Sequence, residues 1–245
     1  MTRIFLEHIL RYDEKVVLDK DNSHYISSVL RMREGEEVML VGSDGKEAVS
    51  EVETITKNEV TLHITSVRDN ESEPRLNITL YQSVSKGERM DLTIQKSVEL
   101  GVSTIVPVWS SRCVVKKDAV IGNSSKNDRW QKIALEAARQ SGRGKVPEVT
   151  DGMKFEQALK KAASECDLVL FPWEEAKGLT LKGALSDKTL NNIGIFIGPE
   201  GGFSEEEAEI AKENGAVPVT LGKRILRTET AGPAVLSMLL FHDEL

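Results

Sequence analysis

The stretch IGPEGGFSEEE, residues 197–207, decides how this chain is interpreted. Three glycines follow an apolar segment, which is a common place for a loop that binds phosphate. The glutamates at 205–207 would repel a phosphate at that position. Ser204 followed by Glu207 is the pattern of a helix capping box, so these acids are expected to begin a helix. The loop should therefore serve a ligand that places no phosphate there.

Glycines without side chains let backbone groups approach a flat, uncharged surface closely. The spacing matches neither GxGxxG nor GxxxxGK[ST], so a dinucleotide fold or a P-loop is poorly supported. A nucleoside attached to a cationic centre fits, and S-adenosylmethionine (SAM) is such a molecule. A plain strand-to-helix turn explains the same residues equally well, so the stretch alone leaves both interpretations open.

A second segment, LGKRILRTETAGPAVLSMLL at residues 221–240, has a similar layout. A Gly-Lys-Arg loop follows a predicted strand, a Thr-Glu-Thr sequence begins a helix, and Pro233 is expected in its first turn, where proline is tolerated. The alternative is a simple helix start capped by Thr228 or Thr230. Two strand-end loops near the C-terminus suggest one shared pocket, because ligands of parallel sheets bind at the carboxyl ends of strands.

The chain from residue 76 onward alternates strands and helices, which indicates an α/β domain with a mostly parallel sheet. Apolar segments predict strands at residues 76–84, 103–110, 166–174, 192–200 and 217–222. Helical periodicity predicts helices at residues 88–100 (ended by Gly101), 127–140, 155–165, 204–215 and 230–245.

The first part of the chain is mostly β by pattern. Strands are predicted at residues 3–6 and 58–67, with a hairpin at 37–55 that turns at Ser43-Asp44-Gly45, and a helix is predicted at 23–38. The polar, proline-ended RDNESEP (68–74) is the best domain boundary. We therefore expect a small barrel or sandwich at residues 1–72 and the α/β domain at 73–245.

Composition is ordinary for a globular protein: 245 residues, 40% hydrophobic and 29% charged. Cys113 and Cys166 form no CxxC pair, and the four histidines are scattered, so reduced thiols and no metal site are expected. The N-terminal residues do not have the pattern of a signal peptide, and no run approaches the roughly 20 apolar residues of a membrane span. A cytoplasmic protein with no membrane partner is expected.

The net charge of −7 argues weakly against a nucleic-acid partner, but the charge is unevenly distributed. Residues 1–72 hold 9 Lys/Arg against 15 Asp/Glu, whereas residues 86–145 hold 12 against 6. A basic strip of this kind can hold a phosphate backbone. On charge alone a solvated helical surface is the favoured explanation.

The two motifs GPEGGFS (198–204) and LGKRILRTETA (221–231), taken together, resemble the RsmE family, the 16S rRNA (uracil-N3)-methyltransferases of the SPOUT superfamily. The resemblance extends along nearly the whole chain. Its further segments are HYISSVLRMREGEEV, KGERMDLTIQKSVELGVSTIVP, RWQKIALEAARQSGR and LVLFPWEEA.

The resemblance implies an N-terminal PUA-like β-barrel that helps bind RNA and a C-terminal SPOUT domain. In that fold, a mostly parallel sheet carries helices on both faces and the chain end forms a trefoil knot, an exception to the usual unknotted rule. SAM would bind in the knot of a homodimer. The methyl group would go to N3 of a uridine in 16S rRNA of the small ribosomal subunit. The acidic N-terminal domain is unexpected for an RNA binder.

The resemblance also suggests site residues. Backbone atoms of three segments would bind SAM: Leu170, Phe171, Pro172; Gly198, Pro199, Glu200, Gly201; Leu221, Gly222, Ile225, Leu226. Arg227 would stabilise the uridine anion, and Glu229 would take its N3 proton or orient Arg227. The alternatives are that Leu170, Ile225 and Leu226 belong to the core, and that Arg227 and Glu229 form a structural ion pair.

Candidate RNA contacts lie mainly in the basic stretch. Arg112, Gln140 and Arg143 are assigned to the RNA or to the uracil edge, in a dimer from the opposite subunit. Arg3, Arg31, Lys86 and Arg89 are weaker candidates for phosphate contacts, and a solvated surface role competes for each.

Two other functions remain open from sequence alone. Another SPOUT methyltransferase could act on tRNA or on a different rRNA position, and a comparison of isolated small-subunit rRNA with bulk tRNA would separate these substrates. A non-catalytic RNA-binding assembly factor would not bind SAM. A Rossmann-type dehydrogenase lacks its glycine fingerprint and has little support.

Overall fold

The computed structural model describes residues 2–56, 59–122, 124–186 and 190–244. The chain divides into two compact units, Met1–Glu73 with Ala138–Val146 and Pro74–Ala137 with Pro147–Leu245. The predicted division into residues 1–72 and 73–245 did not anticipate that residues 138–146 pack with the first unit. The division between the units falls inside one helix, α3 (Ser124–Ser141).

The first unit is a five-stranded half-barrel with the strand order β1-β3-β4-β5-β2. Its strands are β1 (Arg3–Phe5), β2 (Lys15–Val17), β3 (Glu37–Val41), β4 (Glu47–Ile55) and β5 (Val60–Arg68). The predicted hairpin is confirmed as the antiparallel pair β3–β4, and buried side chains such as Ile4, Leu40 and Leu62 fill the interior. The three-residue β2 was not predicted because it is too short to show alternation. Asn58, where the strand predicted at 58–67 begins, lies outside the described residues.

The helix predicted at 23–38 is earlier and shorter in the structure. Helix α1 (Lys20–His24) begins after Asp19, whose carboxylate accepts a hydrogen bond from the backbone N–H of Asn22 at 2.8 Å. A π-helical turn (Tyr25–Val29) follows. Arg31 then adopts a left-handed φ of 55°, which ends the helical path. The apolar run was interpreted correctly as helical, but its start signal was overlooked.

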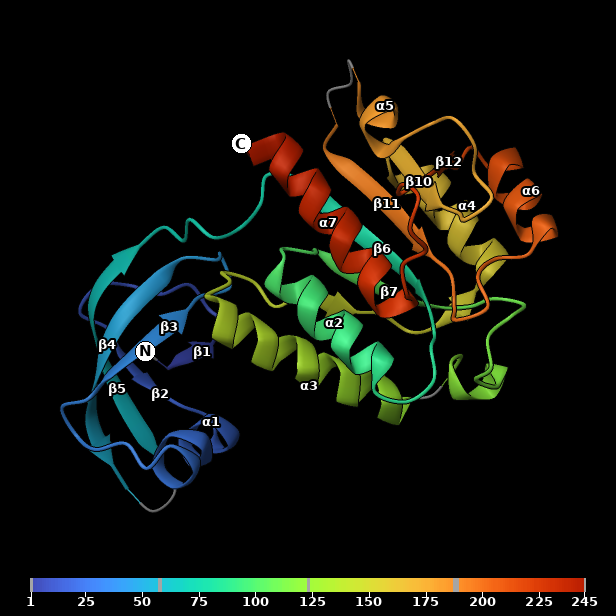
Figure 1. Ribbon diagram of the computed structural model, residues 1–245. Helices are drawn as coiled ribbons and strands as arrows, with labels where there is room; N and C mark the ends of the chain where they lie inside the picture. Colours follow the sequence, from blue (N-terminus) through green and yellow to red (C-terminus); the bar gives the residue numbers. More distant parts are fainter. Residues whose placement is uncertain (1, 57–58, 123, 187–189, 245) are drawn as a thin grey trace. The chain divides into compact units, whose positions relative to one another are not determined.

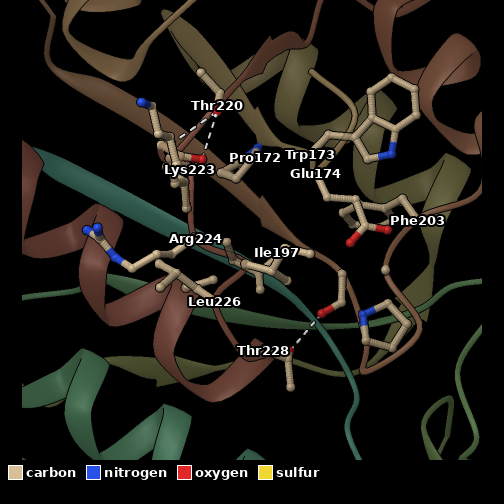
Figure 2. A pocket seen from close by; sticks show the side chains of 17 residues that line it. Pro172, Trp173, Glu174, Ile197, Phe203, Thr220, Lys223, Arg224, Leu226 and Thr228 are labelled. Carbon is tan, nitrogen blue, oxygen red and sulfur yellow. Dashed lines mark hydrogen bonds between the residues drawn. The ribbon is translucent and has the colours of Figure 1, made fainter. Parts of the chain in front are cut away.

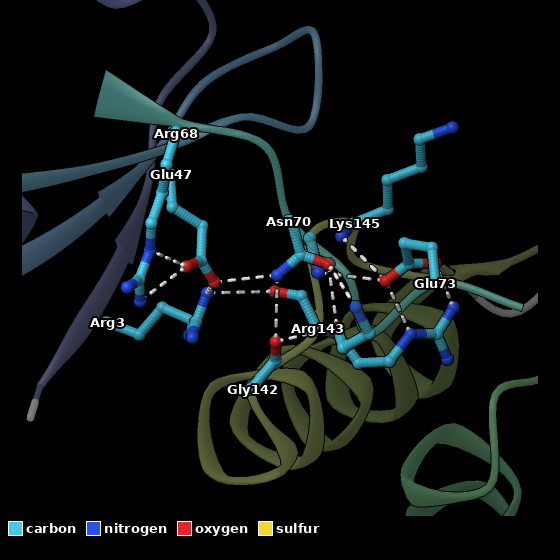
Figure 3. Close-up of polar contacts among 10 residues, drawn as sticks. Arg3, Glu47, Arg68, Asn70, Glu73, Gly142, Arg143 and Lys145 are labelled. Carbon is cyan, nitrogen blue, oxygen red and sulfur yellow. Dashed lines mark hydrogen bonds and ion pairs between the residues drawn. The ribbon is translucent and has the colours of Figure 1, made fainter.

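A buried carboxylate of the first unit, Glu47, collects three side-chain donors (Figure 3). Arg3 forms an ion pair with it, Arg68 donates to its second oxygen at 3.1 Å, and Asn70 donates at 2.6 Å. Asn70 also donates to the carbonyl of Gly142 at 3.2 Å. The network therefore joins residues of the half-barrel to the segment 138–146.

A second ion pair holds the same segment. The guanidinium of Arg143 donates to both carboxylate oxygens of Glu73, at 2.7 and 2.8 Å, and the N–H of Gly144 adds a third bond at 2.8 Å. Arg143 is only 3% exposed. A buried bidentate pair of this kind is costly to break, because removal of one partner leaves a buried charge without a counter-ion.

Acid should destabilise the first unit through these two carboxyls. Burial, the largest single influence, raises each pKa, but hydrogen bonds and charges from the neighbouring arginines outweigh it, so the pKa values of Glu47 and Glu73 are lowered below 4.5. Their contribution to stability is therefore present above about pH 4.5 and is lost as the pH falls through the lowered values. We expect the free energy of urea unfolding to drop across that range, and the drop to be shallower in a Glu47→Gln, Glu73→Gln variant. An equally steep drop in both proteins would contradict this.

The second unit is built on a parallel sheet with the order β12-β10-β11-β6-β7-β8, and β9 pairs with β7. Its strands are β6 (Asn77–Ser83), β7 (Thr104–Trp109), β8 (Glu148–Val149), β9 (Met153–Lys154), β10 (Leu168–Pro172), β11 (Asn192–Ile197) and β12 (Val217–Val219). Every pairing between these strands is parallel, which confirms the sheet predicted from the alternating pattern. All their carboxyl ends therefore lie at one edge.

Helices cover both faces of this sheet, as expected (Figure 1). They are α2 (Arg89–Glu99), most of α3, α4 (Phe155–Glu165), α5 (Leu181–Leu185), α6 (Glu205–Glu213) and α7 (Thr228–Glu244), with a 3-10 turn at Lys117–Ala119. Helices α4 and α6 pack on one face over an aromatic core in which the rings of Tyr81 and Phe196 stack 4.5 Å apart. Helix α7 contacts α2, β6 and β11 on the other face.

Some boundaries in the second unit differ from the prediction. Helix α7 begins at Thr228 rather than Thr230, so Pro233 lies in the second turn, where it provides no N–H for the carbonyl of Glu229. The short elements α5, β8 and β9 were not predicted, and Leu245 lies outside the described residues.

The trefoil knot stays a prediction. No helix in the described ranges is both long and apolar enough to span a bilayer.

Candidate functional site

A cavity of about 370 Å³ lies at the carboxyl edge of the parallel sheet (Figure 2). Its walls come from the loops after β10, β11 and β12 and from the first turn of α7. The lining residues are Pro172, Trp173, Glu174, Ile197, Gly198, Pro199, Gly202, Phe203, Thr220, Leu221, Gly222, Lys223, Arg224, Ile225, Leu226, Thr228 and Ala231. The two motifs singled out in the sequence thus form one shared pocket.

Seven of the predicted cofactor residues line this cavity: Pro172, Gly198, Pro199, Leu221, Gly222, Ile225 and Leu226. The idea that Ile225 belongs to the core is wrong, because its side chain is 81% exposed at the cavity. Leu226 is half-buried and lines the cavity as well.

The other four predicted cofactor residues do not line the cavity. Leu170 and Phe171 are fully buried, and the Phe171 ring stacks on Phe203 at 4.5 Å, so both side chains belong to the core. Glu200 and Gly201 contact arginines instead: Arg89 binds the Glu200 carboxylate, and Arg112 donates to the Gly201 carbonyl at 3.0 Å.

The glycine loop is tied to α7 by one buried hydroxyl. Thr228 Oγ1 donates to the carbonyl of Gly198 at 2.7 Å and accepts a hydrogen bond from Gln82 Nε2 at 2.9 Å. Gln82 is fully buried at the carboxyl end of β6. The Thr228 hydroxyl therefore joins the two motifs across the central strand, a role different from the helix cap considered from sequence.

Loss of this hydroxyl should loosen the cavity. Thr228→Val keeps the shape but leaves the Gly198 carbonyl without this donor, while Gln82 Nε2 keeps only its bond to the Ser83 carbonyl. An unsatisfied buried group costs about 1–3 kcal/mol. We expect a lower free energy of unfolding in urea and weaker ligand binding in the cavity. Thr228→Ser, which keeps the hydroxyl, should stay close to the wild type in both measurements. Equal values for the valine and serine variants would contradict this role.

The predicted capping box at the start of α6 is confirmed. Ser204 Oγ accepts from the Glu207 N–H at 3.1 Å, and Glu207 Oε2 accepts from the Ser204 N–H at 3.0 Å. The other oxygen of Glu207 accepts from the Ser111 N–H at 2.7 Å. The acidic run thus caps α6 and holds the loop after β7, and it leaves no anion site at this helix end.

The cavity walls combine apolar and polar groups, and they include the charged side chains of Glu174, Lys223 and Arg224. Figure 2 shows Glu174 on one side of the cavity and Lys223 and Arg224 on the opposite side. The exposed Lys223 and Arg224 lie in the loop after β12, and Glu174 lies beside Gly202, which has a φ of 66°. Such walls suit a flat neutral group with a positive charge near Glu174. No cluster of metal-binding side chains occurs among the residues that the structure describes.

A group of charged side chains lies next to the cavity. Glu200 Oε1 accepts from the Lys86 N–H at 2.9 Å and from Arg89 Nη1 at 2.8 Å, while Arg89 Nε lies 3.8 Å from Glu229 Oε1. Burial raises the pKa of Glu200, but these hydrogen bonds outweigh it and the pKa is lowered. Glu229 pairs with Arg89, so the ion pair considered between Arg227 and Glu229 does not form; the Arg227 side chain is exposed.

The predicted RNA contacts fall into separate groups. Lys86, Arg89 and Arg112 lie in the second unit around Glu200 and Gly201, close to the cavity loops. Arg31 and Gln140 are exposed residues of the first unit. Arg3 and Arg143 belong to that unit too, but their guanidinium groups are engaged by Glu47 and Glu73. Their structural role does not favour direct RNA contact.

Sequence reasoning missed several lining residues, notably Trp173, Glu174, Gly202, Thr220 and Thr228. Trp173, Glu174, Gly202 and Thr220 lie within a few residues of the end of β10, β11 or β12, whereas Thr228 is the first residue of α7. A rule that assigns the first residues after every parallel strand to the site would have included most of them. Lys223 and Arg224 were read only as part of a loop.

Comparison with known protein families gives a consistent result. Residues 71–240 match the model of an RNA methyltransferase domain, and residues 18–65 match that of an RNA methyltransferase PUA domain. The chain is 33% identical over 253 residues to ribosomal RNA small subunit methyltransferase E of Bacillus subtilis, across 100% of this chain and 98% of the relative. It is also 33% identical over 214 residues to the protein of that name from Aquifex aeolicus, across 86% and 88%.

Among solved structures, ribosomal RNA small subunit methyltransferase E from Neisseria gonorrhoeae, bound to S-adenosyl methionine, is 37% identical. It aligns with a TM-score of 0.88 over 99% of this chain and 98% of its own. The match therefore includes both units, the parallel sheet and the loops that form the cavity. This chain belongs to the family of RNA methyltransferases whose domain model it matches over residues 71–240.

Proposed function

We propose that this chain transfers a methyl group from SAM to N3 of a uridine in 16S rRNA of the small ribosomal subunit. The observation that carries the proposal is the single cavity that both motifs build at the carboxyl edge of the sheet. The Neisseria gonorrhoeae relative, 37% identical, is bound to S-adenosyl methionine, and the Bacillus subtilis relative is named for small-subunit ribosomal RNA.

The cavity fits SAM by its chemistry. Its volume of about 370 Å³ lies within the range of roughly 300–1,000 Å³ that is usual for small-molecule sites. Leu221, Ile225 and Leu226 offer apolar contact to an adenine, and backbone groups around Gly198 can meet its polar edge. Glu174 gives a carboxylate for the hydroxyl or cationic groups of the donor. The capped start of α6 suits a ligand without phosphate.

SAM, when bound, supplies a methyl group already activated by its sulfonium charge. The chain must then orient the uracil and help N3 lose its proton. We assign proton acceptance to Glu229, because it follows the cavity residue Thr228 in the first turn of α7 and its Oε2 has no hydrogen-bond partner within the described structure. We assign stabilisation of the developing charge on the uracil oxygens to Arg227, whose exposed guanidinium is close along the chain to Leu226 and Thr228 of the cavity.

RNA would be bound by basic groups of both units. Lys86 and Arg112 lie beside the cavity loops and are exposed, so they can meet phosphates near the target base. Arg31 and Gln140 can contribute from the first unit, which includes the matched PUA segment. To expose N3, the uridine must leave its stack, and the loops around the cavity would receive it. The rRNA substrate makes the cytoplasm the expected place of action.

We further propose that the protein acts as a knotted homodimer. The apolar side chains of Leu92, Met238 and Phe241 are 43%, 44% and 69% exposed on the neighbouring helices α2 and α7. A second copy would cover them, since clustered exposed apolar side chains mark interaction sites.

A charge on this face should dissociate the dimer. We expect wild-type protein to sediment as a dimer and Phe241→Glu to sediment as a monomer at the same concentration, because burial of a carboxylate in an apolar interface is costly. Val114→Glu, a change at another exposed apolar residue, is the matched control and should remain dimeric. A monomeric wild type, or an Phe241→Glu dimer of unchanged affinity, would contradict the assignment.

The function itself is tested with a nucleoside analysis. Purified protein is incubated with labelled SAM and unmodified small-subunit particles, the RNA is digested, and the methylated nucleoside is identified by mass spectrometry. The expected product is 3-methyluridine. Label in bulk tRNA but not in small-subunit RNA would show that tRNA, not 16S rRNA, is the substrate. SAM binding without transfer to any RNA would overturn the proposed reaction.

A further inference from the structure

We propose that Arg89 is a positioning residue: its guanidinium bridges the carboxylates of Glu200 and Glu229 and thereby fixes the orientation of the Glu229 carboxylate. The inference rests on the proposed function, since Glu229 is the assigned proton acceptor. It gives Arg89 a role different from the phosphate contact expected from sequence.

The geometry of the bridge joins three separate elements. Arg89 is the first residue of α2, Glu200 lies in the loop after β11, and Glu229 lies in the first turn of α7. Arg89 Nη1 is 2.8 Å from Glu200 Oε1, and Arg89 Nε is 3.8 Å from Glu229 Oε1. One cation therefore connects the glycine loop and the helix that follows the second cofactor loop.

Charge explains why a cation is needed there. The side chains of Glu200 and Glu229 are 25% and 15% exposed, so two carboxylates share a partly desolvated region. Like charges in such a region repel each other, and an arginine between them offsets that repulsion. The Lys86 N–H also donates to Glu200, which fixes the first carboxylate from the same loop that begins α2.

The bridge leaves one acceptor unused. Glu229 faces Arg89 with Oε1, whereas Oε2 has no partner among the described residues and is almost inaccessible. A buried polar atom without a partner requires an explanation in a native structure. The contact of Oε1 with Arg89 determines which oxygen remains available, and a uracil N3–H donor would satisfy Oε2 once the groups that cover this atom have moved.

The competing role for Arg89 is direct contact with an RNA phosphate. Its side chain is 41% exposed, so exposure alone does not decide between the two roles. The roles differ in their dependence on Glu229. If Arg89 acts by orienting Glu229, its substitution has little further effect on the rate once that carboxylate has been removed. If Arg89 contacts a phosphate, its substitution lowers the rate by the same factor with or without the Glu229 carboxylate.

The experiment is a double-mutant cycle on methyl transfer to small-subunit particles, with SAM affinity measured separately by calorimetry. The variants are Arg89→Ala, Glu229→Gln and the pair. We expect Arg89→Ala to lower the single-turnover rate about 10–100-fold, with SAM affinity within about threefold, and to cause less than a twofold further loss in the Glu229→Gln protein. Where Glu229 is intact, Arg89→Lys should keep part of the rate that Arg89→Ala loses. Added guanidinium should restore part of the rate of the Arg89→Ala protein.

Arg129→Ala is the matched control, because Arg129 of α3 forms an ion pair with Asp91 of α2, the helix that carries Arg89, and does not line the cavity. It should keep the wild-type rate. Equal proportional losses from Arg89→Ala in the wild-type and Glu229→Gln proteins, or no loss in either, would overturn the positioning role. Equal losses would instead support direct contact of Arg89 with an RNA phosphate. If wild-type protein makes no methylated nucleoside at all, the proposed function fails instead.

Discussion

Glu229→Gln is expected to lower the rate of methyl transfer by about 10²–10⁴-fold, the usual effect of removing a general base. Glutamine has nearly the same shape and can still meet Arg89, but it cannot take a proton from uridine N3. The change lies outside the cavity wall, so SAM affinity should stay within about threefold. The measurement is the single-turnover rate with saturating SAM and unmodified small-subunit particles, beside calorimetric titration with SAM.

Glu205→Gln is the control for this experiment. It removes the same charge from the first turn of a helix, but Glu205 is exposed on α6 and does not line the cavity. Its rate should match the wild type. A Glu229→Gln enzyme with a rate within twofold of the wild type would remove Glu229 from proton transfer and leave Arg227 as the remaining candidate for catalysis. Loss of SAM binding in this variant would instead show a structural role.

The secondary structure of the second unit could be predicted well from sequence because its long elements carry strong periodic signals. The strand predicted at 192–200 and the helix predicted at 204–215 correspond to β11 and α6. Short elements such as β2 and α5 carry too few residues for a period to appear. Their formation depends on partners distant in the chain, which a local pattern does not contain.

The sequence was a good guide to which loops form the site, but a poorer guide to which side chains interact there. Position after a parallel strand brought Gly198 and Leu221 together correctly. The ion-pair partner of Glu229 was not predictable, because Arg89 is 140 residues away in sequence and reaches it only through the order of the strands β11-β6. Likewise, Arg143 looked like an RNA contact by charge, and only its burial against Glu73 reveals a structural role.

The opening motif follows the same logic. From sequence, the acidic run predicts a capped helix and the absence of a phosphate, and the structure gives its last carboxylate a second role. Glu207 closes the capping box and also binds the Ser111 N–H, so one carboxylate anchors the loop that carries Arg112. Arg112 in turn donates to the carbonyl of Gly201. Glu207 therefore stabilises the glycine loop from outside through the loop that carries Arg112.

Gly198→Val is expected to weaken SAM binding at least 100-fold, or about 2.7 kcal/mol. A Cβ at this position would lie 3.2 Å from the backbone carbon of Gly202 and 3.3 Å from the Phe203 ring. Backbone on the far side of a tight loop cannot move as a flexible side chain can, so the loop must open. The carbonyl of Gly198, which binds Thr228, would shift with it. Calorimetry with SAM measures the loss, and circular dichroism checks that the variant is folded.

Gly201→Ala is the matched control, since a Cβ there meets only the Arg112 side chain and backbone at 3.4 Å or more, which is ordinary contact. Its SAM affinity should stay within about threefold of the wild type, although sequence alone placed both glycines in the cofactor loop. Gly198→Ala, with a single added methyl, should fall between the two and serves if the valine variant does not fold. Unchanged affinity in both Gly198 variants would mean that SAM binds elsewhere, because the walls of this cavity cannot keep their shape around the added carbon atoms.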